Sequence, residues 1–265
     1  MKLAVVITHA DYEPWRSIFT NGQVQTWVSE MSETVILAQG VKLPNWIRKA
    51  DSKLWGLRWK KSTGPLIVIL EIWLLRILNR FEPMAKKESI APKIEKWEFR
   101  MPDSDFLMSK KIEAVFRAAR EEEFDFLVLT TSSSYINVRA LKSELHTMPT
   151  TGFAGGRVLS QNRHTFLSGS FRVFSKDVVT KISESYKERN FRMVEDMSLG
   201  NLLSQLKIPL VGISSLDIES INQLFAMDKE VILGHSHFRV KSGKLTSRND
   251  VSLMIEIHEI VKRKK

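Results

Sequence analysis

Two adjacent carboxylates, Glu195 and Asp196, stand at the start of a predicted helix that runs to Leu206. A single acid in a first helical turn is ordinary, because the positive end of the helix dipole stabilises it. Two acids directly behind the apolar Val194 need a further explanation. A carboxylate at such a place can accept the proton of a hydroxyl nucleophile, so the segment predicts a general base.

A polar turn at residues 130–134 follows the apolar run of residues 124–129, which predicts a buried strand. In an open parallel sheet, ligands bind beyond the carboxyl ends of the strands. The turn is therefore a candidate phosphate or sugar site. The alternative is an ordinary strand-to-helix turn in which a serine caps the next helix.

Glycine-rich, aromatic segments occupy residues 152–157 and 165–174. Glycine lets a bulky ligand approach the backbone, so these segments are candidates for lining a binding site. Loop flexibility explains the same composition equally well.

One face of a predicted short strand carries His235, His237, Arg239 and Lys241. Two histidines alone make an incomplete metal site. A cationic clamp for a leaving pyrophosphate is at least as good an explanation, and a solvated strand face is the alternative without a function. No motif of a dinucleotide-binding protein, P-loop NTPase, zincin or α/β-hydrolase occurs in the chain.

The elements that must position these residues alternate between strands and helices. Residues 2–9 and 34–38 predict buried strands, and residues 13–31 between them predict a helix. This opening indicates an α/β domain with a parallel sheet. Further helices are predicted at residues 104–123, 138–145, 177–186, 195–206 and 252–264, with a strand at 209–213 and a loop containing a strand at 231–250.

The chain of 265 residues has no cysteine, which excludes disulfides, thiolate zinc sites and cysteine nucleophiles. Its net charge of +10 lies in two places: seven Lys/Arg and one Asp at residues 42–61 give +6, and four Lys/Arg at 262–265 give +4. The remainder is neutral. We therefore expect a globular domain with two basic appendages that meet nucleic acid or an anionic membrane surface.

Residues 42–95 break the α/β pattern and predict an inserted segment. Four of the seven tryptophans lie there among basic residues, and residues 65–80 predict an apolar helix. Tryptophan beside lysine suits an anionic membrane interface. As a role for this segment, a helical lid or a homo-oligomer contact ranks just below membrane binding. Nucleic-acid binding ranks last, because no nucleic-acid module accompanies the basic, tryptophan-rich segment. The apolar runs are too short for a signal peptide or a membrane span, so we expect a cytoplasmic protein, peripheral at the membrane surface.

In order and spacing, these segments resemble the fringe and β-galactosyltransferase group of GT-A glycosyltransferases. The resemblance runs from about residue 97 to 213, with weaker support at 1–40 and 231–241. It rests on a lysine-bearing helix, on the strand and turn Leu127-Val-Leu-Thr-Thr-Ser-Ser-Ser-Tyr-Ile-Asn137, on residues 166–179, and on Glu195-Asp196-Met-Ser-Leu-Gly200. It implies a single GT-A domain over residues 1–265, Rossmann-like, with a mostly parallel central sheet flanked by helices.

The resemblance also implies a reaction. A sugar would move from a nucleotide-diphosphate sugar to a hydroxyl of a glycan or lipid-linked acceptor, with inversion. Asp196 would be the base, and Glu195 would orient the acceptor or support Asp196. The expected donor-binding residues are His9, Lys110, Lys111, Thr131, Ser132, Ser133, Ser134, His235, His237, Arg239 and Lys241; the expected acceptor-binding residues are Gly155, Gly156, Arg157, Ser168, Gly169 and Ser170.

The chain departs from the family at the metal site. Where family members carry an aspartate-rich turn that binds Mn²⁺ or Mg²⁺, this chain has Ser132, Ser133 and Ser134. Neutral hydroxyls hold a hard cation poorly. Either basic side chains offset the diphosphate charge without a metal ion, or the fold persists without catalysis and binds carbohydrate or a partner. We favour the first hypothesis, with no metal ligand in the chain, because Asp196 and the acceptor segment match the family.

Overall fold

The computed structural model of the chain describes residues 1–57, 66, 69, 85–104, 107–161, 163–189, 193–242 and 248–263. Most of the apolar helix expected at residues 65–80 lies outside these ranges.

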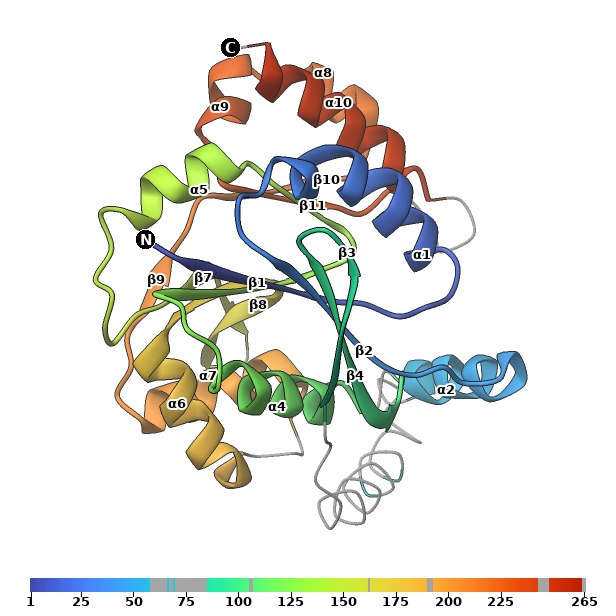
Figure 1. Cartoon of the computed structure of the whole chain (residues 1–265), viewed down its shortest axis with the longest axis vertical. Coiled ribbons are helices and arrows are strands. Elements are labelled where there is room, and N and C mark those ends of the chain that lie inside the picture. Colours follow the sequence, from blue (N-terminus) through green and yellow to red (C-terminus); the bar gives the residue numbers. More distant parts are fainter. Residues whose placement is uncertain are drawn as a thin grey trace.

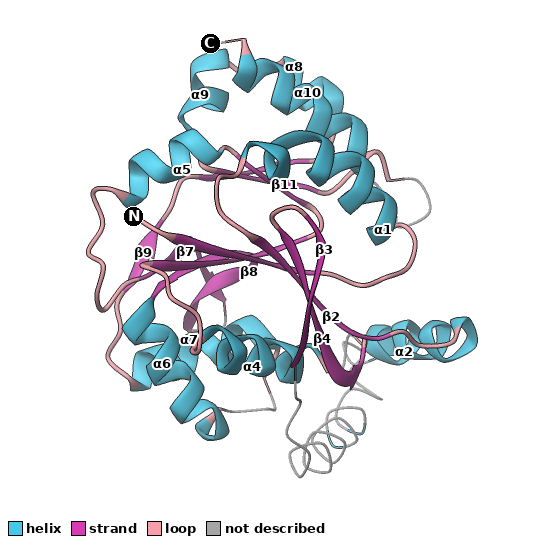
Figure 2. Ribbon diagram, in the orientation of Figure 1, coloured by secondary structure: helices cyan, strands magenta, loops and turns pink. Residues whose placement is uncertain are grey.

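An eight-stranded sheet forms the centre of the molecule (Figure 2). Its strands lie in the order β3-β4-β2-β1-β5-β8-β7-β9. Their bounds are β1 Leu3–Thr8, β2 Val35–Val41, β3 Ala85–Ala91, β4 Ile94–Pro102, β5 Phe126–Thr131, β7 Ala154–Gln161, β8 His164–Ser175 and β9 Leu210–Gly212. The pairs β4–β2, β2–β1, β1–β5 and β7–β9 are parallel, and β3–β4, β5–β8 and β7–β8 are antiparallel. The sheet is therefore mixed, with its parallel strands gathered around β1.

The central strands are apolar on both faces because both faces are covered. In β1, the side chains of Leu3, Val5 and Ile7 join one buried cluster, while Ala4 and Val6 join a second cluster on the opposite face. The first cluster is built around Trp27, Tyr135 and Phe238. The second contains Trp97 and the edge-to-face pair of Phe116 and Phe174, whose ring centroids are 5.3 Å apart.

Helices cover the two faces of the sheet (Figure 1). One layer holds α4 Met108–Ala119, α6 Lys176–Ser185 and α7 Glu195–Gln205. The opposite layer holds α1 Trp15–Ser17, η1 Ile18–Val28, α5 Val138–Leu145, α8 Ile221–Phe225, α9 Lys229–Gly234 and α10 Asp250–Lys262. Within that layer lies a small second sheet of β10 Ser215–Ile218, β11 His237–Val240 and β6 Ser134–Ile136, in that order. A short turn, η2 Tyr186–Glu188, follows α6.

Helix α2, Asn45–Leu57, projects from the side of the domain (Figure 1). The end of the inserted segment that we expected at residues 42–95 contains a β-hairpin, formed by β3 and β4. Strand β4 alternates Trp97, Phe99 and Met101, all buried, with charged residues, a period-two pattern that the expectation of an insertion to residue 95 overlooked. Because β4 pairs in parallel with β2, it belongs to the central sheet.

The remaining elements lie close to their predicted positions, with the helix expected from residue 104 beginning at Met108. The loop expected at 231–250 contains the short helix α9 as well as strand β11. In the part of the chain that the structure describes, no helix has the length and apolarity needed to cross a bilayer.

Candidate active site

A cavity of about 450 Å³ opens beyond the carboxyl ends of β1, β4 and β5. Eleven of the nineteen predicted site residues line it: His9, Lys111, Thr131, Ser132, Ser133, Ser168, Gly169, Ser170, Asp196, Arg239 and Lys241. The lining also includes residues that sequence reasoning did not select: Thr8, Ala10, Tyr12, Trp15, Asp103, Ser104, Met108, Leu159 and Arg248. The cavity thus joins the polar turn, the glycine-rich strand and the second of the paired carboxylates.

In the serine turn, residues 132–134, two side chains line the cavity and the third is buried in the interior. The hydroxyl of Ser132 lies 3.3 Å from Nδ1 of His9, and the hydroxyl of Ser133 accepts a hydrogen bond of 2.8 Å from Arg248 Nη2. Ser134 is fully buried, donates to the Ser170 carbonyl and lies 3.0 Å from His237 Nε2. Ser132 and Ser133 are therefore the members of the triplet that can meet a ligand.

A buried lysine lines the cavity beside the first strand. Lys111 Nζ donates to the His9 carbonyl and, at 2.6 Å, to Asp103 Oδ1. Burial lowers the pKa of the Lys111 ammonium and Asp103 opposes that shift. Burial, followed by the charge of Lys111, lowers the pKa of His9 to about 4. His9 is consequently a neutral imidazole at physiological pH, able to donate or accept one hydrogen bond at each nitrogen.

Among the described residues, the carboxylate of Asp103 forms its hydrogen bonds through one of its two oxygens. Oδ1 accepts from Lys111 and from the Gly40 amide at 2.9 Å, whereas Oδ2 is buried with no hydrogen-bond partner in the structure. A carboxylate oxygen normally accepts one or two hydrogen bonds, and leaving it without any is costly. Asp103 lines the cavity, so a ligand donor is the natural partner for Oδ2.

Three cationic side chains face the cavity from the loop and strand around β11. Arg239 and Lys241 follow one another on alternate positions, and no hydrogen bond or ion pair of their side chains is found among the residues described above. Arg248 is fixed by Asp250, by Ser133 and by the ring of Trp15, which lies 4.8 Å from the guanidinium carbon. The cavity therefore has an excess of positive charge on this side.

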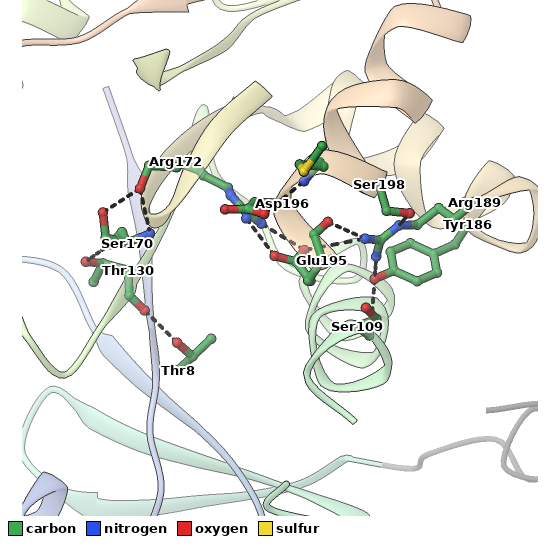
Figure 3. Close-up of polar contacts among 12 residues, drawn as sticks. Thr8, Ser109, Thr130, Ser170, Arg172, Tyr186, Arg189, Glu195, Asp196 and Ser198 are labelled. Carbon is green, nitrogen blue, oxygen red and sulfur yellow. Dashed lines mark hydrogen bonds and ion pairs between the residues drawn. The ribbon is translucent and has the colours of Figure 1, made fainter. Parts of the chain in front are cut away.

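The two adjacent acids at the start of α7 have different environments (Figure 3). Glu195 receives two hydrogen bonds from the buried Arg172, at 2.9 and 2.6 Å, and lies 3.7 Å from Arg189. Burial alone would raise the pKa of Glu195, but the charge and hydrogen bonds of Arg172 lower it. Asp196 lines the cavity, and its Oδ1 accepts only from the Met197 amide at 2.9 Å among the contacts found in the described chain.

A buried network fixes Glu195 from behind (Figure 3). Arg189 donates to the Ser198 hydroxyl, the Glu195 carbonyl and the Tyr186 hydroxyl, which in turn donates to the Ser109 carbonyl of α4. Burial lowers the pKa of the Arg189 guanidinium to about 10, so it stays charged at neutral pH. The start of α7 is thereby tied to β8, η2 and α4.

Gly169 leaves the space in front of these acids open. A Cβ at this position would lie 3.1 Å from Arg172 Nη2 and 3.9 Å from one carboxylate oxygen each of Asp196 and Glu195. The missing side chain therefore gives a ligand hydroxyl access to Asp196.

Eight predicted residues lie outside the cavity lining, each with a partner or a packing role. Lys110 pairs with Glu113 at 2.6 Å and Arg157 pairs with Asp217. A Cβ on Gly155 or Gly156 would lie 2.5 Å from the Phe153 ring or 2.6 Å from the Phe171 carbonyl, so both glycines allow close strand packing. Glu195 and Ser134 have the contacts described above.

The two histidines of the predicted cationic face are also outside the cavity. His235 Nδ1 contacts the Val231 carbonyl at 2.6 Å. His237 is fully buried, stacks on Phe171 with 4.4 Å between centroids, and contacts Ser215 and Ser134. Burial lowers the pKa of His237 to about 3, so it is a neutral packing residue.

The residues of the cavity do not fit a divalent cation. Among the described residues, no group of three or more His, Cys, Asp or Glu could hold a metal ion. Asp103 shares its carboxylate with the Lys111 ammonium, and the serine turn offers hydroxyls, which are weak ligands for Mg²⁺ or Mn²⁺.

The comparisons with known proteins agree with part of this picture. Residues 156–213 match the family model of galactosyltransferases. This match confirms the predicted resemblance over β8, Glu195 and Asp196. It supports the predicted enzyme class, a hexosyl- or pentosyltransferase, and of the two it supports a hexosyltransferase. No curated protein matches the chain. Among solved structures, 4-diphosphocytidyl-2C-methyl-D-erythritol synthase from Anaerococcus prevotii aligns over 99% of this chain and 96% of its own, with 9% identity and a TM-score of 0.40.

Proposed function

We propose that the chain is a GT-A-type glycosyltransferase that moves a hexose from a nucleotide-diphosphate sugar to a hydroxyl of a glycan or lipid-linked acceptor, with inversion and without a bound metal ion. The observation that carries the proposal is a single cavity with cations on one side and the cavity-facing carboxylate of Asp196 on another. The family match over residues 156–213 supports the transfer of a hexose.

The order of the strands suggests how a donor would lie. Along β4-β2-β1-β5-β8, the site residues follow as Asp103, His9, then Ser132 and Ser133, then Gly169 with Asp196 beside it. Neighbouring strands are about 4.8 Å apart, so four steps span about 19 Å. An elongated donor fits this row with its nucleoside near Asp103, its diphosphate at the serine turn and its sugar near Gly169.

The leaving diphosphate needs positive charge and hydrogen-bond donors. Arg239, Lys241 and Arg248 supply the charge, and the hydroxyls of Ser132 and Ser133 supply donors. Preorganised donors and cations aimed at the charge that develops in the transition state lower the barrier without a metal ion. Arginine suits this task because its planar guanidinium binds phosphate oxygens in pairs.

Asp196 is the proposed base. Its carboxylate accepts the proton of the acceptor hydroxyl as that oxygen bonds to the anomeric carbon. The bond from the anomeric carbon to the diphosphate oxygen breaks, and the diphosphate leaves with the electron pair. Glu195 holds Arg172 and the start of α7 in place, so it positions Asp196 rather than receiving the proton.

A transfer assay with the purified chain and a panel of nucleotide hexoses tests the proposal. We expect turnover that is unchanged by excess chelator, and turnover that chelator abolishes would refute the metal-free mechanism. The alternative, a carbohydrate-binding protein without catalysis, predicts that Asp196→Asn leaves the function unchanged. Donor binding without transfer by any panel member, in wild type and variant alike, would favour that alternative.

A further inference from the structure

Helix α2 presents two different faces. Trp46, Lys49, Ala50 and Lys53 recur at helical spacing and are all exposed, with Trp46 at 74% of its maximum. Lys42, just before the helix, is exposed as well. A large apolar ring surrounded by lysines is an unusual surface for a helix that projects from a domain (Figure 1).

The other face of α2 is fastened to the rim of the cavity. The guanidinium carbon of Arg48 lies 4.1 Å from the centre of the Tyr12 ring, and Arg48 also donates to the Glu13 carbonyl. Asp51 accepts a hydrogen bond of 2.6 Å from the Ser104 hydroxyl. Tyr12 and Ser104 both line the cavity, so whatever binds the outer face of α2 is held beside the site.

Exposed apolar side chains are frequent in the part of the sequence that contains this helix. The described residues include ten exposed large apolar side chains, of which four lie between residues 41 and 69: Val41, Trp46, Leu66 and Ile69. Three of these four are aliphatic. Aliphatic side chains gain free energy by entering lipid, whereas nucleic-acid bases are bound by stacking on aromatic rings. The combination with a local charge of +6 at residues 42–61 favours an anionic lipid surface over nucleic acid.

We infer that the outer face of α2, formed by Lys42, Trp46, Lys49 and Lys53, docks the protein on a bilayer surface that carries anionic phospholipids. The indole of Trp46 enters the interface, and the three ammonium groups face the lipid phosphates. This docking brings the mouth of the cavity to the lipid surface. The consequence that the acceptor hydroxyl belongs to a lipid-linked molecule rests on the proposed function; the docking itself does not.

Vesicle co-sedimentation tests the docking directly. The probes are vesicles of phosphatidylcholine alone and of phosphatidylcholine with phosphatidylglycerol in equal parts. We expect binding only to the anionic vesicles, weakened by salt. The variant Lys42→Gln/Lys49→Gln/Lys53→Gln should bind about 100-fold more weakly, because each lysine near such a surface contributes about 1 kcal/mol. Trp46→Ala should bind about tenfold more weakly, because the variant no longer buries the apolar surface of the indole in the membrane interface.

A matched control replaces three exposed lysines on other elements, Lys187, Lys207 and Lys229, with glutamine. It removes the same charge and should bind anionic vesicles like the wild type. Equal losses in the control and the α2 variant would reduce the effect to net charge and overturn the inference. The inference is also overturned if the α2 variant binds anionic vesicles as well as the wild type does. It is overturned as well if, in a parallel assay, the α2 variant loses binding to single-stranded RNA and keeps its binding to vesicles. Thermal melting of each variant shows whether it is folded.

Turnover on a soluble acceptor separates this inference from the proposed function. The α2 variants should retain the wild-type rate on such an acceptor, since no substituted residue lines the cavity. A chain that docks on anionic vesicles yet transfers no sugar would refute the proposed function and leave the docking standing.

Discussion

The two ends of the cavity use a buried ion pair in opposite ways. At one end, the paired acid itself lines the cavity: Asp103 is held by Lys111 through Oδ1, and its Oδ2 has no partner within the described part of the chain. At the other end, the paired acid lies outside the cavity lining: Glu195 is held by Arg172, and its neighbour Asp196 faces the cavity. Arg172 lowers the pKa of Glu195 against the effect of burial, so Glu195 resists taking a proton. We therefore propose hydrogen-bond recognition at the Asp103 end and proton transfer at the Asp196 end.

The largest expected effect comes from removing the proton acceptor. Asp196→Asn should lower kcat about 10³-fold, the range for loss of a general base, while donor affinity stays near that of the wild type. Single-turnover kinetics and calorimetric binding of the nucleotide sugar measure the two quantities. A variant that loses donor affinity and rate together would place Asp196 in binding instead.

The supporting pair at the same end should act on stability. Arg172→Met leaves the buried Glu195 without its main partner, so we expect a loss of about 3 kcal/mol in the free energy of unfolding. This loss is at the low end of the range for breaking a buried ion pair, because Arg189 remains 3.7 Å from Glu195. Urea denaturation measures it. In the matched double variant Arg172→Met/Glu195→Gln, stability should partly recover, since the uncompensated charge is removed.

Between the two ends, His9 should make stability depend on pH. Its pKa is lowered from 6.5 to about 4 in the folded chain, so the unfolded chain binds more protons between these values. The neutral imidazole therefore contributes stability above pH 6.5, and this contribution, about 3 kcal/mol for a pKa difference of about 2.5, is lost as the pH falls toward 4. Denaturation of the wild type and of His9→Gln across this pH range measures it. Parallel pH profiles for the two proteins would contradict a buried neutral His9.

The smallest effect is expected at the recognition end. Asp103→Asn should weaken the binding of a nucleoside diphosphate about tenfold, as expected for one hydrogen bond to a charged acceptor, and leave the binding of pyrophosphate unchanged. Calorimetry with UDP, GDP and pyrophosphate measures the contrast. Arg248→Met is the matched control, because it should weaken all three ligands equally. Equal losses for UDP and pyrophosphate in Asp103→Asn would remove the distinction between the two ends.

Local patterns in the sequence anticipated much of the scaffold. The apolar runs at residues 2–9 and 124–129 became β1 and β5, and the polar turn after the second run lines the cavity. Strands β3 and β4 were missed, because the lysines and prolines around them obscured the alternation of Trp97, Phe99 and Met101. With β4 missed, Asp103 at its carboxyl end was missed too. Arg248 belongs to no periodic segment and is held at the cavity by contacts with Asp250, Ser133 and Trp15.

The sequence by itself determined which kinds of side chain come to the edge of the sheet: hydroxyls after β5, a pair of lysines on α4 and a pair of acids on α7. Only the tertiary structure decided which member of each pair meets a ligand. Adjacent residues on a helix point about 100° apart, so Lys111 enters the cavity while Lys110 pairs with Glu113, and Asp196 enters it while Glu195 pairs with Arg172. That choice depends on how α4 and α7 are rotated against the sheet, which long-range packing sets and local sequence does not.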